Sequence, residues 1–130
     1  MTIEFTVPGR PVPMARPRVT SRGTFTPKDC VAYKKVVSMV ARNAMRTAEA
    51  EMFDGEPLEC RVRFIFPLPK SRKNPYATSR PDLDNLYKSV TDAMNGIVYK
   101  DDSQIVRAFV EKAYEINGGG RAEIWVREIV

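Results

Sequence analysis

The sequence contains no histidine, and this absence removes several classes of catalytic site. Serine–histidine and cysteine–histidine triads, most zinc enzymes and mechanisms with a histidine general base are excluded. Only two cysteines are present, Cys30 and Cys60, which is too few for a disulfide framework, and neither has a second thiol at metal-ligand spacing. Any catalysis would therefore depend on carboxylates, lysine, tyrosine or a bound metal.

Long apolar segments are also missing. No apolar run approaches the ~20 residues that a membrane span needs, and residues 3–8 are too short and too polar for a signal peptide. We therefore expect a cytoplasmic protein without a membrane partner. A chain of 130 residues is long enough to bury one core and too short for two, which predicts a single domain over residues 1–130.

Positive charge is abundant and unevenly distributed along the chain. The net charge is +5, residues 10–46 hold nine lysines and arginines against one acid, and residues 61–80 hold six bases and no acid. Such segregation favours a polyanionic partner, because neutralising phosphates releases the counterions condensed on them. The alternative is a set of solvated basic faces.

Short segments of alternating apolar and polar residues predict four strands. The segment 58–66 is the clearest, with one apolar face and a polar face that carries Glu59, Arg61 and Arg63. The two strands nearest the C-terminus are expected to form an antiparallel hairpin, because a glycine-rich turn separates them. Trp125 in the last strand is interpreted as a core or dimer contact rather than a base-stacking platform. The expected strands are residues 3–8, 58–66, 104–116 and 121–129.

Helical spacing of apolar residues predicts two helices. The first is expected to begin with Thr26 as its N-cap and to continue to a stop at Asp54-Gly55. Its polar face carries lysines and arginines that would either line a nucleic-acid groove or simply be solvated. The second is expected to begin at Asp82 or Asp84 and to end at Asn95-Gly96.

Between the first strand and the first helix, the chain is rich in proline and arginine and poor in apolar side chains. It predicts an extended path with a short hairpin around Arg22-Gly23. We interpret this segment as an arm laid on a partner rather than as part of the core, with an ordinary basic loop as the alternative. Together the elements predict an α+β fold of two layers, in which a mixed β-sheet carries two main helices on one face.

Acidic residues are concentrated around the start of the second expected helix. On a helical wheel Asp84, Lys88 and Asp92 share the polar side. Asp82 is expected before the first turn, because Arg80 precedes a proline and is biased to extended geometry, and its side chain then points to the side of Asp84. Carboxylate oxygens are the ligands that Mg²⁺ prefers, so the cluster suggests metal-assisted phosphodiester chemistry. An aspartate at a helix start is also an ordinary cap.

A second pair of acids, Asp101 and Asp102, lies where the chain is expected to enter the third strand. A short connection would return them to the helix start, although adjacent acids are also ordinary turn formers. If the acids hold metal, Lys88 would contact the scissile phosphate or orient the attacking water; otherwise it is a surface partner of Asp84. A restriction-type nuclease core fits poorly, because that pattern needs acid-x-lysine on a strand.

Three motifs stand out in this part of the chain: Asp82-Leu83-Asp84-Asn85-Leu86-Tyr87-Lys88, Asp92-Ala93-Met94-Asn95-Gly96 and Asp101-Asp102-Ser103-Gln104-Ile105-Val106. They resemble the RusA family of Holliday junction resolvases, small endodeoxyribonucleases often carried by phages and prophages. Their order and spacing agree, and the first strand and the basic arm are also similar, so the resemblance covers essentially the whole chain. It implies a RusA-like fold and a homodimer that introduces paired nicks into four-way DNA junctions, in recombination and repair, with Mg²⁺ or Mn²⁺ as cofactor.

The resemblance also implies roles for individual residues. The metal ligands would be Asp82, Asp84 and Asp102, and Lys88 matches the essential lysine. Asp92 and Asp101 belong to the pattern with supporting roles: orientation of the lysine and support of the metal shell.

Basic residues are expected to hold the arms of the junction. Arg80 matches a basic residue just before the first acid of the family, although Pro81 departs from the family pattern. The expected DNA contacts are Arg10, Arg16, Arg18, Lys70, Arg72, Lys73 and Arg80.

The hypothesis from sequence is thus a Mg²⁺-dependent junction resolvase, and two alternatives stay open. One is a less selective nuclease for flaps or other branched DNA. The other is a DNA-binding protein without catalysis, whose acids serve as caps and turn residues. Unpaired acids in a groove would weaken DNA binding by repulsion unless metal were present, which argues against the second alternative.

Overall fold

The computed structural model describes residues 1–15, 18–21, 23–25, 27–71 and 74–130. Three of the expected DNA contacts, Arg16, Arg72 and Lys73, lie outside these residues, as does the expected N-cap Thr26.

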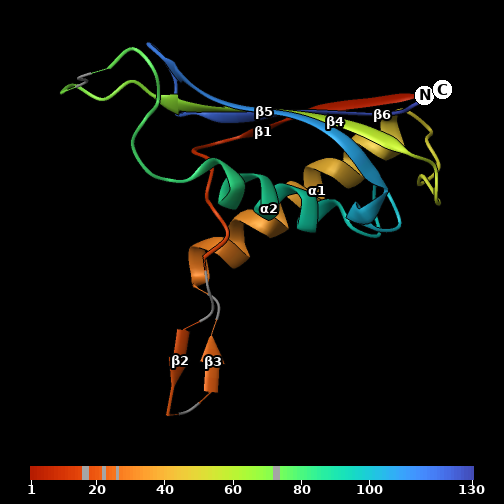
Figure 1. Ribbon diagram of the computed structural model, residues 1–130, viewed down its shortest axis with the longest axis horizontal. Coiled ribbons are helices and arrows are strands. Elements are labelled where there is room, and N and C mark those ends of the chain that lie inside the picture. The colour runs from red at the N-terminus through yellow and green to blue at the C-terminus, as the bar shows by residue number, and fades with distance from the viewer. Residues whose placement is uncertain (16–17, 22, 26, 72–73) are drawn as a thin grey trace.

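A four-stranded mixed sheet forms one layer of the molecule (Figure 1). Its strands are β1 (Thr2–Pro8), β4 (Leu58–Pro67), β5 (Ile105–Glu115) and β6 (Arg121–Glu128), in the order β1-β6-β4-β5. The strand β6 is antiparallel to both of its neighbours, whereas β5 is parallel to β4. The period-two pattern of the sequence turns one side of each strand towards the core.

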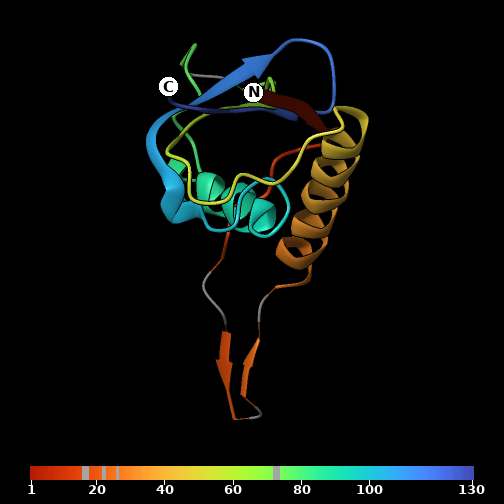
Figure 2. The same ribbon diagram turned by 90° about the vertical axis from the view of Figure 1, so that its right-hand side faces the viewer.

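Two helices cover one face of this sheet and form the second layer (Figure 2). The helix α1 spans Lys28–Thr47 and α2 spans Leu83–Met94. The residues that α1 buries recur every three or four positions, which directs one stripe of the helix inwards. The structure therefore confirms the predicted α+β fold, with a mixed sheet and two helices on one face. No helix in the described ranges combines the length and apolarity that a bilayer crossing requires.

The expected hairpin between the last two strands is wrong. The strand β4 lies between β5 and β6, and the connection at residues 116–120 passes across its end. There the backbone is so close that a Cβ on Gly120 would come within 2.8 Å of the carbonyl oxygen of Ile65. Crossing one strand requires only about 10 Å, twice the strand spacing. The central position suits β4 because it is apolar on its inner face over its whole length.

The first helix is shorter than predicted, because it ends at Thr47 rather than at Asp54-Gly55. Glu49 adopts a positive φ of 51°, and the backbone N–H of Ala50 donates to the carbonyl of Met45, which closes the last turn. The chain then runs back so that Phe53 enters the core, 5 % exposed. Continuing the helix would have left this ring outside the core.

The basic arm contains the predicted hairpin, formed by β2 (Arg18–Thr20) and β3 (Gly23–Phe25). The hairpin projects from the body on the helix side, away from the sheet (Figures 1 and 2). At its base the N–H of Met14 donates to the carbonyl of Asn85 in the first turn of α2, at 2.9 Å. The root of the arm is thus fixed beside the helix start that carries the acidic motif.

Candidate active site

Two aspartates, Asp82 and Asp84, lie at the start of α2. Asp82 is the N-cap residue with extended φ and ψ of −71° and 142°, as expected, and its side chain makes no capping hydrogen bond. Asp84 lies in the first turn, and both side chains are exposed. The positive end of the helix dipole and the unpaired N–H groups of the first turn favour anionic oxygens here.

One row of α2 lines a hollow of about 430 Å³ together with residues from a distant part of the chain. Asp84, Lys88 and Asp92 recur every four residues and therefore face the same side of the helix. Asp102 faces them from the short 3₁₀ helix η1 (Asp102–Gln104), and the first residues of β5 complete the opposite wall. The structure thus brings four of the expected site residues to one place.

The two adjacent aspartates before β5 have different surroundings. Asp101 caps η1: its side chain accepts from the N–H of Ser103 at 3.2 Å, and Gln104 reaches back to the N–H of Asp101 at 3.1 Å. The hydrogen bonds from Ser103 lower the pKa of the Asp101 carboxyl. Asp102 faces the hollow instead. Asp101 is therefore placed as a structural cap, and Asp102 as the available carboxylate.

Asn95, the residue after α2, holds Asp102 by two reciprocal hydrogen bonds. The Asp102 N–H donates to Oδ1 of Asn95 at 2.9 Å, and Nδ2 of Asn95 donates to Oδ2 of Asp102 at 3.2 Å. One side chain thus fixes both the backbone and the carboxylate of Asp102. The sequence indicated Asn95-Gly96 as a helix end and as part of the second RusA-like motif, but it did not predict this contact with Asp102.

Lys88 and Asp92 form an ion pair along the same row, with 3.4 Å between Nζ and Oδ2. The lysine side chain is 62 % exposed and the aspartate 23 %. An exposed i,i+4 pair contributes only about 0.3–0.5 kcal/mol to stability. At the site the pair orients the Lys88 side chain, because it keeps the ammonium group at the hollow.

Tyr87 lines the hollow, and its hydroxyl interacts with the buried thiol of Cys60. The Tyr99 hydroxyl donates to the carbonyl of Thr91 at 2.7 Å, and burial raises the pKa of Tyr99 well above its usual range. Burial likewise raises the pKa of Tyr87, and it raises the pKa of Cys60 to about 12. Cys60 is fully buried, as expected for a small apolar core residue, and a thiol with such a pKa is not a nucleophile at neutral pH.

Comparison with known proteins shows which family this chain belongs to. The profile of the family described as Endodeoxyribonuclease RusA matches residues 8–127. The chain belongs to the RusA family. It is 35 % identical over 140 residues to the uncharacterized protein YqaN of Bacillus subtilis strain 168, covering 98 % of this chain and 96 % of that protein. It is 38 % identical over 88 residues to the crossover junction endodeoxyribonuclease rusA of Lactococcus phage r1t, covering 65 % of this chain and 66 % of the phage protein.

The donor atoms of this RusA-family site fit a hard divalent cation. In the described ranges, no three acidic or thiol side chains are already gathered to hold a metal ion. Asp84 and Asp102 face the common hollow, whereas Asp82 and Asp101 do not line it. Mg²⁺ is usually bound through one or two carboxylates and keeps waters and substrate phosphates as its other ligands. Two carboxylates that line an open hollow match that requirement.

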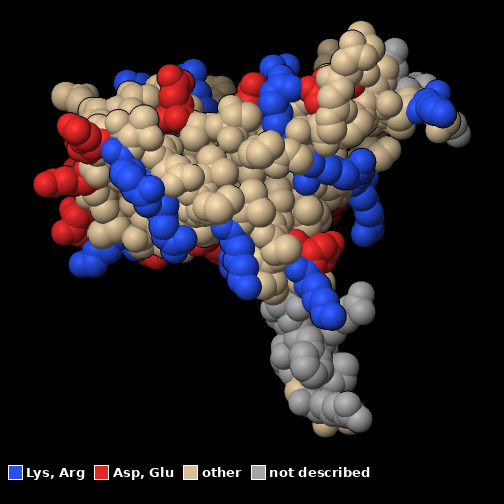
Figure 3. All heavy atoms as spheres, turned by 180° about the vertical axis from the view of Figure 1, so that it is seen from behind, with Lys and Arg blue, Asp and Glu red and all other residues tan. Residues whose placement is uncertain are grey.

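Two of the expected DNA-contact residues of this RusA-family chain lie at the loop that leads into α2. Arg10 and Arg80 line one small cleft of about 170 Å³, with Arg10 stacked 5.3 Å from the ring centroid of Phe66. The peptide bond between Arg80 and Pro81 is cis. Lys70 is exposed beyond the end of β4, and Arg18 opens the projecting hairpin. Figure 3 shows further basic side chains along the course of α1.

Lys112 of β5 is a contact that sequence reasoning missed. Its Nζ donates to the carbonyls of Ser79 and Pro81, both at 3.0 Å. These bonds tie the loop that carries Arg80 and Asp82 to the sheet. A lone lysine in a strand carries no sequence signal for a partner more than thirty residues away.

Proposed function

We propose that this protein is a metal-dependent endodeoxyribonuclease that resolves four-way DNA junctions in recombination and repair, acting as a homodimer in the cytoplasm. The observation that carries the proposal is the hollow in which Asp84, Lys88, Asp92 and Asp102 meet, in a chain of the RusA family. The phage relative named as a crossover junction endodeoxyribonuclease supports the choice of a junction as substrate.

Each group at the site has a role in this proposal. Asp84 and Asp102, with Asp82 at the helix start beside them, would hold Mg²⁺ or Mn²⁺. The ion would activate a water for in-line attack on the phosphodiester and offset charge on the leaving oxygen. Lys88 would stabilise the charge that develops on the phosphate, and Asp92 would orient Lys88 through the 3.4 Å ion pair.

The basic residues around the site would hold the DNA backbone. Arg10 and Arg80 lie in the cleft next to the Asp82 loop, where they would meet the strand that enters the hollow. The projecting hairpin, fixed at its base to the first turn of α2, would reach a second arm of the junction. Because these contacts are mainly with phosphates, binding should weaken steeply as the salt concentration rises.

The test compares substrates with and without metal. Purified protein is incubated with a labelled four-way junction, a flap and a linear duplex, in Mg²⁺, in Mn²⁺ or in EDTA. We expect cleavage of the junction in either metal and none in EDTA. Absence of metal-dependent cleavage on every substrate would leave only a DNA-binding protein. Equal cutting of flap or linear duplex would contradict the preference for junctions.

Asn95→Ala tests whether the reciprocal hydrogen bonds position Asp102. Loss of a residue that supports a metal ligand typically weakens metal affinity by about 10- to 100-fold. We therefore expect the half-saturating Mg²⁺ concentration to rise about tenfold or more, with most of the maximal cleavage rate recovered at high Mg²⁺. Mn²⁺ binding followed by electron paramagnetic resonance should weaken in parallel.

Lys100→Ala is the control for Asn95→Ala, because the Lys100 side chain lies close by and is exposed, with an ion pair to Asp54 at 3.8 Å. Its backbone N–H bonds to Phe53 and Gln104 are retained in the variant. We expect it to leave the Mg²⁺ dependence unchanged. An unchanged Mg²⁺ dependence in Asn95→Ala, with a folded protein, would show that Asp102 needs no such support.

A further inference from the structure

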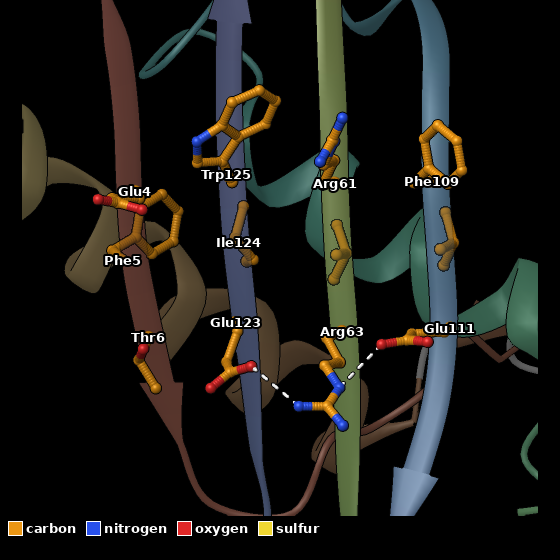
Figure 4. A pocket seen from close by; sticks show the side chains of 12 residues that line it. Glu4, Phe5, Thr6, Arg61, Arg63, Phe109, Glu111, Glu123, Ile124 and Trp125 are labelled. Carbon is orange, nitrogen blue, oxygen red and sulfur yellow. Dashed lines mark ion pairs between the residues drawn. The ribbon is translucent and has the colours of Figure 1, made fainter.

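The sheet face opposite the helices is built as an interaction surface. Within the described residues, both helices lie on one side of the sheet, and the side chains on the other side form the walls of a hollow of about 740 Å³ (Figure 4). Strand register sets these side chains in rows across the sheet.

The central row is aromatic and cationic on β6, β4 and β5, and it ends at Glu4 on β1. Trp125, Arg61 and Phe109 are register partners on β6, β4 and β5, and Figure 4 shows them side by side. The guanidinium of Arg61 lies 4.9 Å from the Trp125 ring centroid and 5.3 Å from that of Phe109. Phe109 is 62 % exposed, and Trp125 is half-buried. A large exposed aromatic next to stacked arginine is typical of the centre of a protein interface.

The row on one side of this centre carries a net positive charge. Arg127, Glu59 and Arg107 are register partners, and Glu59 accepts from Arg107 at 2.9 Å and from Arg127 at 3.0 Å. These arginines enclose Glu59, whose side chain is only 3 % exposed although no other layer covers this face in the described residues. The hydrogen bond from Arg127 lowers the pKa of Glu59, so the carboxyl stays charged at neutral pH.

The row on the other side carries a net negative charge. Glu123, Arg63 and Glu111 are register partners, with Arg63 lying 2.8 Å from Glu111 and 3.9 Å from Glu123 (Figure 4). Strand by strand, each charge in this row is opposite in sign to the charge in the positive row. The two outer rows are therefore complementary to each other in charge.

We infer that a second copy of this chain docks on this face, related by a two-fold axis that runs across the strands along the central row. Such an axis sets the positive row of one copy over the negative row of the other. Arg127, Glu59 and Arg107 then meet Glu123, Arg63 and Glu111 of the second copy. At the centre each side chain meets the same side chain of the second copy, so the aromatic rings stack and the two Arg61 guanidinium groups lie between these stacked rings. The inference rests on the homodimer of the proposed function and names the surface that forms it.

The size of the face agrees with this occupant, and its charge argues against DNA. Strands of 7 to 11 residues give a face of about 30 Å by 19 Å, or about 600 Å² per copy, near the lower limit for a specific interface. Glu4, Glu111 and Glu123 would repel phosphates on this face. A balanced mixture of arginine, glutamate and aromatic residues suits a protein partner.

This arrangement has a consequence for the two sites. The axis runs across the strands and passes the edge strand β5, whose first residues line the catalytic hollow. Both hollows would therefore open at the same end of the dimer, one on each side of the axis. Such a pair of sites matches a substrate in which two opposing strands are cut.

Phe109→Glu tests the surface, with Met39→Glu as its matched control on the exposed side of α1, where Met39 is 54 % exposed. Sedimentation of the full chain should show a dimer for the parent protein and for Met39→Glu. Placing two like charges at the centre of the interface should weaken dimerisation about 30-fold or more, a typical loss at a hot spot. Far-ultraviolet circular dichroism should show that both variants are folded.

A charge exchange provides the second test. Arg127→Glu and Glu123→Arg should each weaken the dimer, and the double variant should regain most of the lost affinity. Arg127 pairs with Glu59 and Glu123 pairs with Arg63 and Arg121 within one chain, so only a contact between copies predicts this rescue. A dimer unaffected by Phe109→Glu, or a double variant no tighter than the single ones, would overturn the inference.

Trp125 is the only tryptophan, so its fluorescence reports directly on this face. Dilution through dissociation should shift its emission to the red in the parent protein. A monomer whose Trp125 emission changes only when a junction is added would assign the face to DNA and overturn the inference. Cleavage is measured separately. If the protein dimerises through this face but cuts no DNA, only the proposed nuclease function is contradicted. If the protein cuts DNA but does not dimerise through this face, only the inferred dimer surface is contradicted.

Discussion

Asp102→Asn is expected to lower the rate of junction cleavage by about 100- to 1,000-fold, the usual loss when one electrostatic group of an active site is removed. The substitution keeps the shape of the side chain, and its amide oxygen can still accept from Nδ2 of Asn95, which lies 3.2 Å from Asp102. Only the negative charge is lost. Single-turnover cleavage of a labelled four-way junction in Mg²⁺ measures the effect.

Binding should survive this substitution. Asp102 carries no positive charge to contribute to phosphate contacts, so a gel-shift assay with the junction should give an affinity equal to or higher than that of the parent protein. Loss of binding together with cleavage would indicate that the turn had been disturbed rather than that a metal ligand had been removed.

Asp101→Asn is the matched control, one residue away. Asp101 caps η1 through the N–H of Ser103, and asparagine is an equally good cap. We therefore expect cleavage within about twofold of the parent rate, since a retained cap leaves local stability nearly unchanged. Equal losses in the two variants would contradict the division of roles between the two aspartates.

The contrast between these aspartates shows where sequence reasoning about the site ends. The wheel placed Asp84, Lys88 and Asp92 on one side of α2, and all three line the hollow. It could not choose between Asp101 and Asp102, because both are acids at the same turn. The choice depends on backbone directions in η1, which only the folded chain defines.

Contacts over long sequence separations were the other part that the sequence could not predict. Lys112 supports the Asp82 loop across more than thirty residues, and the pattern of β5 gives no sign of it. The glycine-rich turn also favoured a hairpin of β5 and β6. In the structure β4 lies between these two strands, because burial of its apolar inner face is most favourable with a neighbouring strand on each side. Hydrophobic periodicity and capping residues predict helices and strands well. The order of strands in the sheet depends instead on how the whole chain buries its apolar side chains.

The same distinction applies to Trp125. Its place beside apolar residues suggested either the core or a dimer contact, and the alternation of β6 turns it to the face opposite the helices. There it stacks against Arg61 and Arg127, whose guanidinium carbons lie 4.9 and 5.4 Å from its ring centroid. It is therefore not a core residue.

Lys88→Met is expected to lower the cleavage rate by about 100-fold, because in the proposed mechanism it removes the positive charge that stabilises the negative charge developing on the phosphate. The side chain is 62 % exposed, so its loss should leave the melting temperature nearly unchanged. Lys88→Arg restores the charge with a different shape, and we expect partial activity. A rate for Lys88→Met close to that of the parent protein would remove Lys88 from the mechanism.

Combining Lys88→Met with Asp92→Asn separates two roles for Asp92. If Asp92 acts by orienting Lys88 through the 3.4 Å ion pair, Asp92→Asn alone should slow cleavage, but should add little once Lys88 is gone. If Asp92 instead binds the metal, its effect does not pass through Lys88, and the two losses should multiply. The geometry favours the first outcome, because the carboxylate that would bind metal is already paired with the ammonium group. Rates of the four proteins at saturating Mg²⁺ give the coupling directly, and a coupling near zero would move Asp92 from positioning to metal binding.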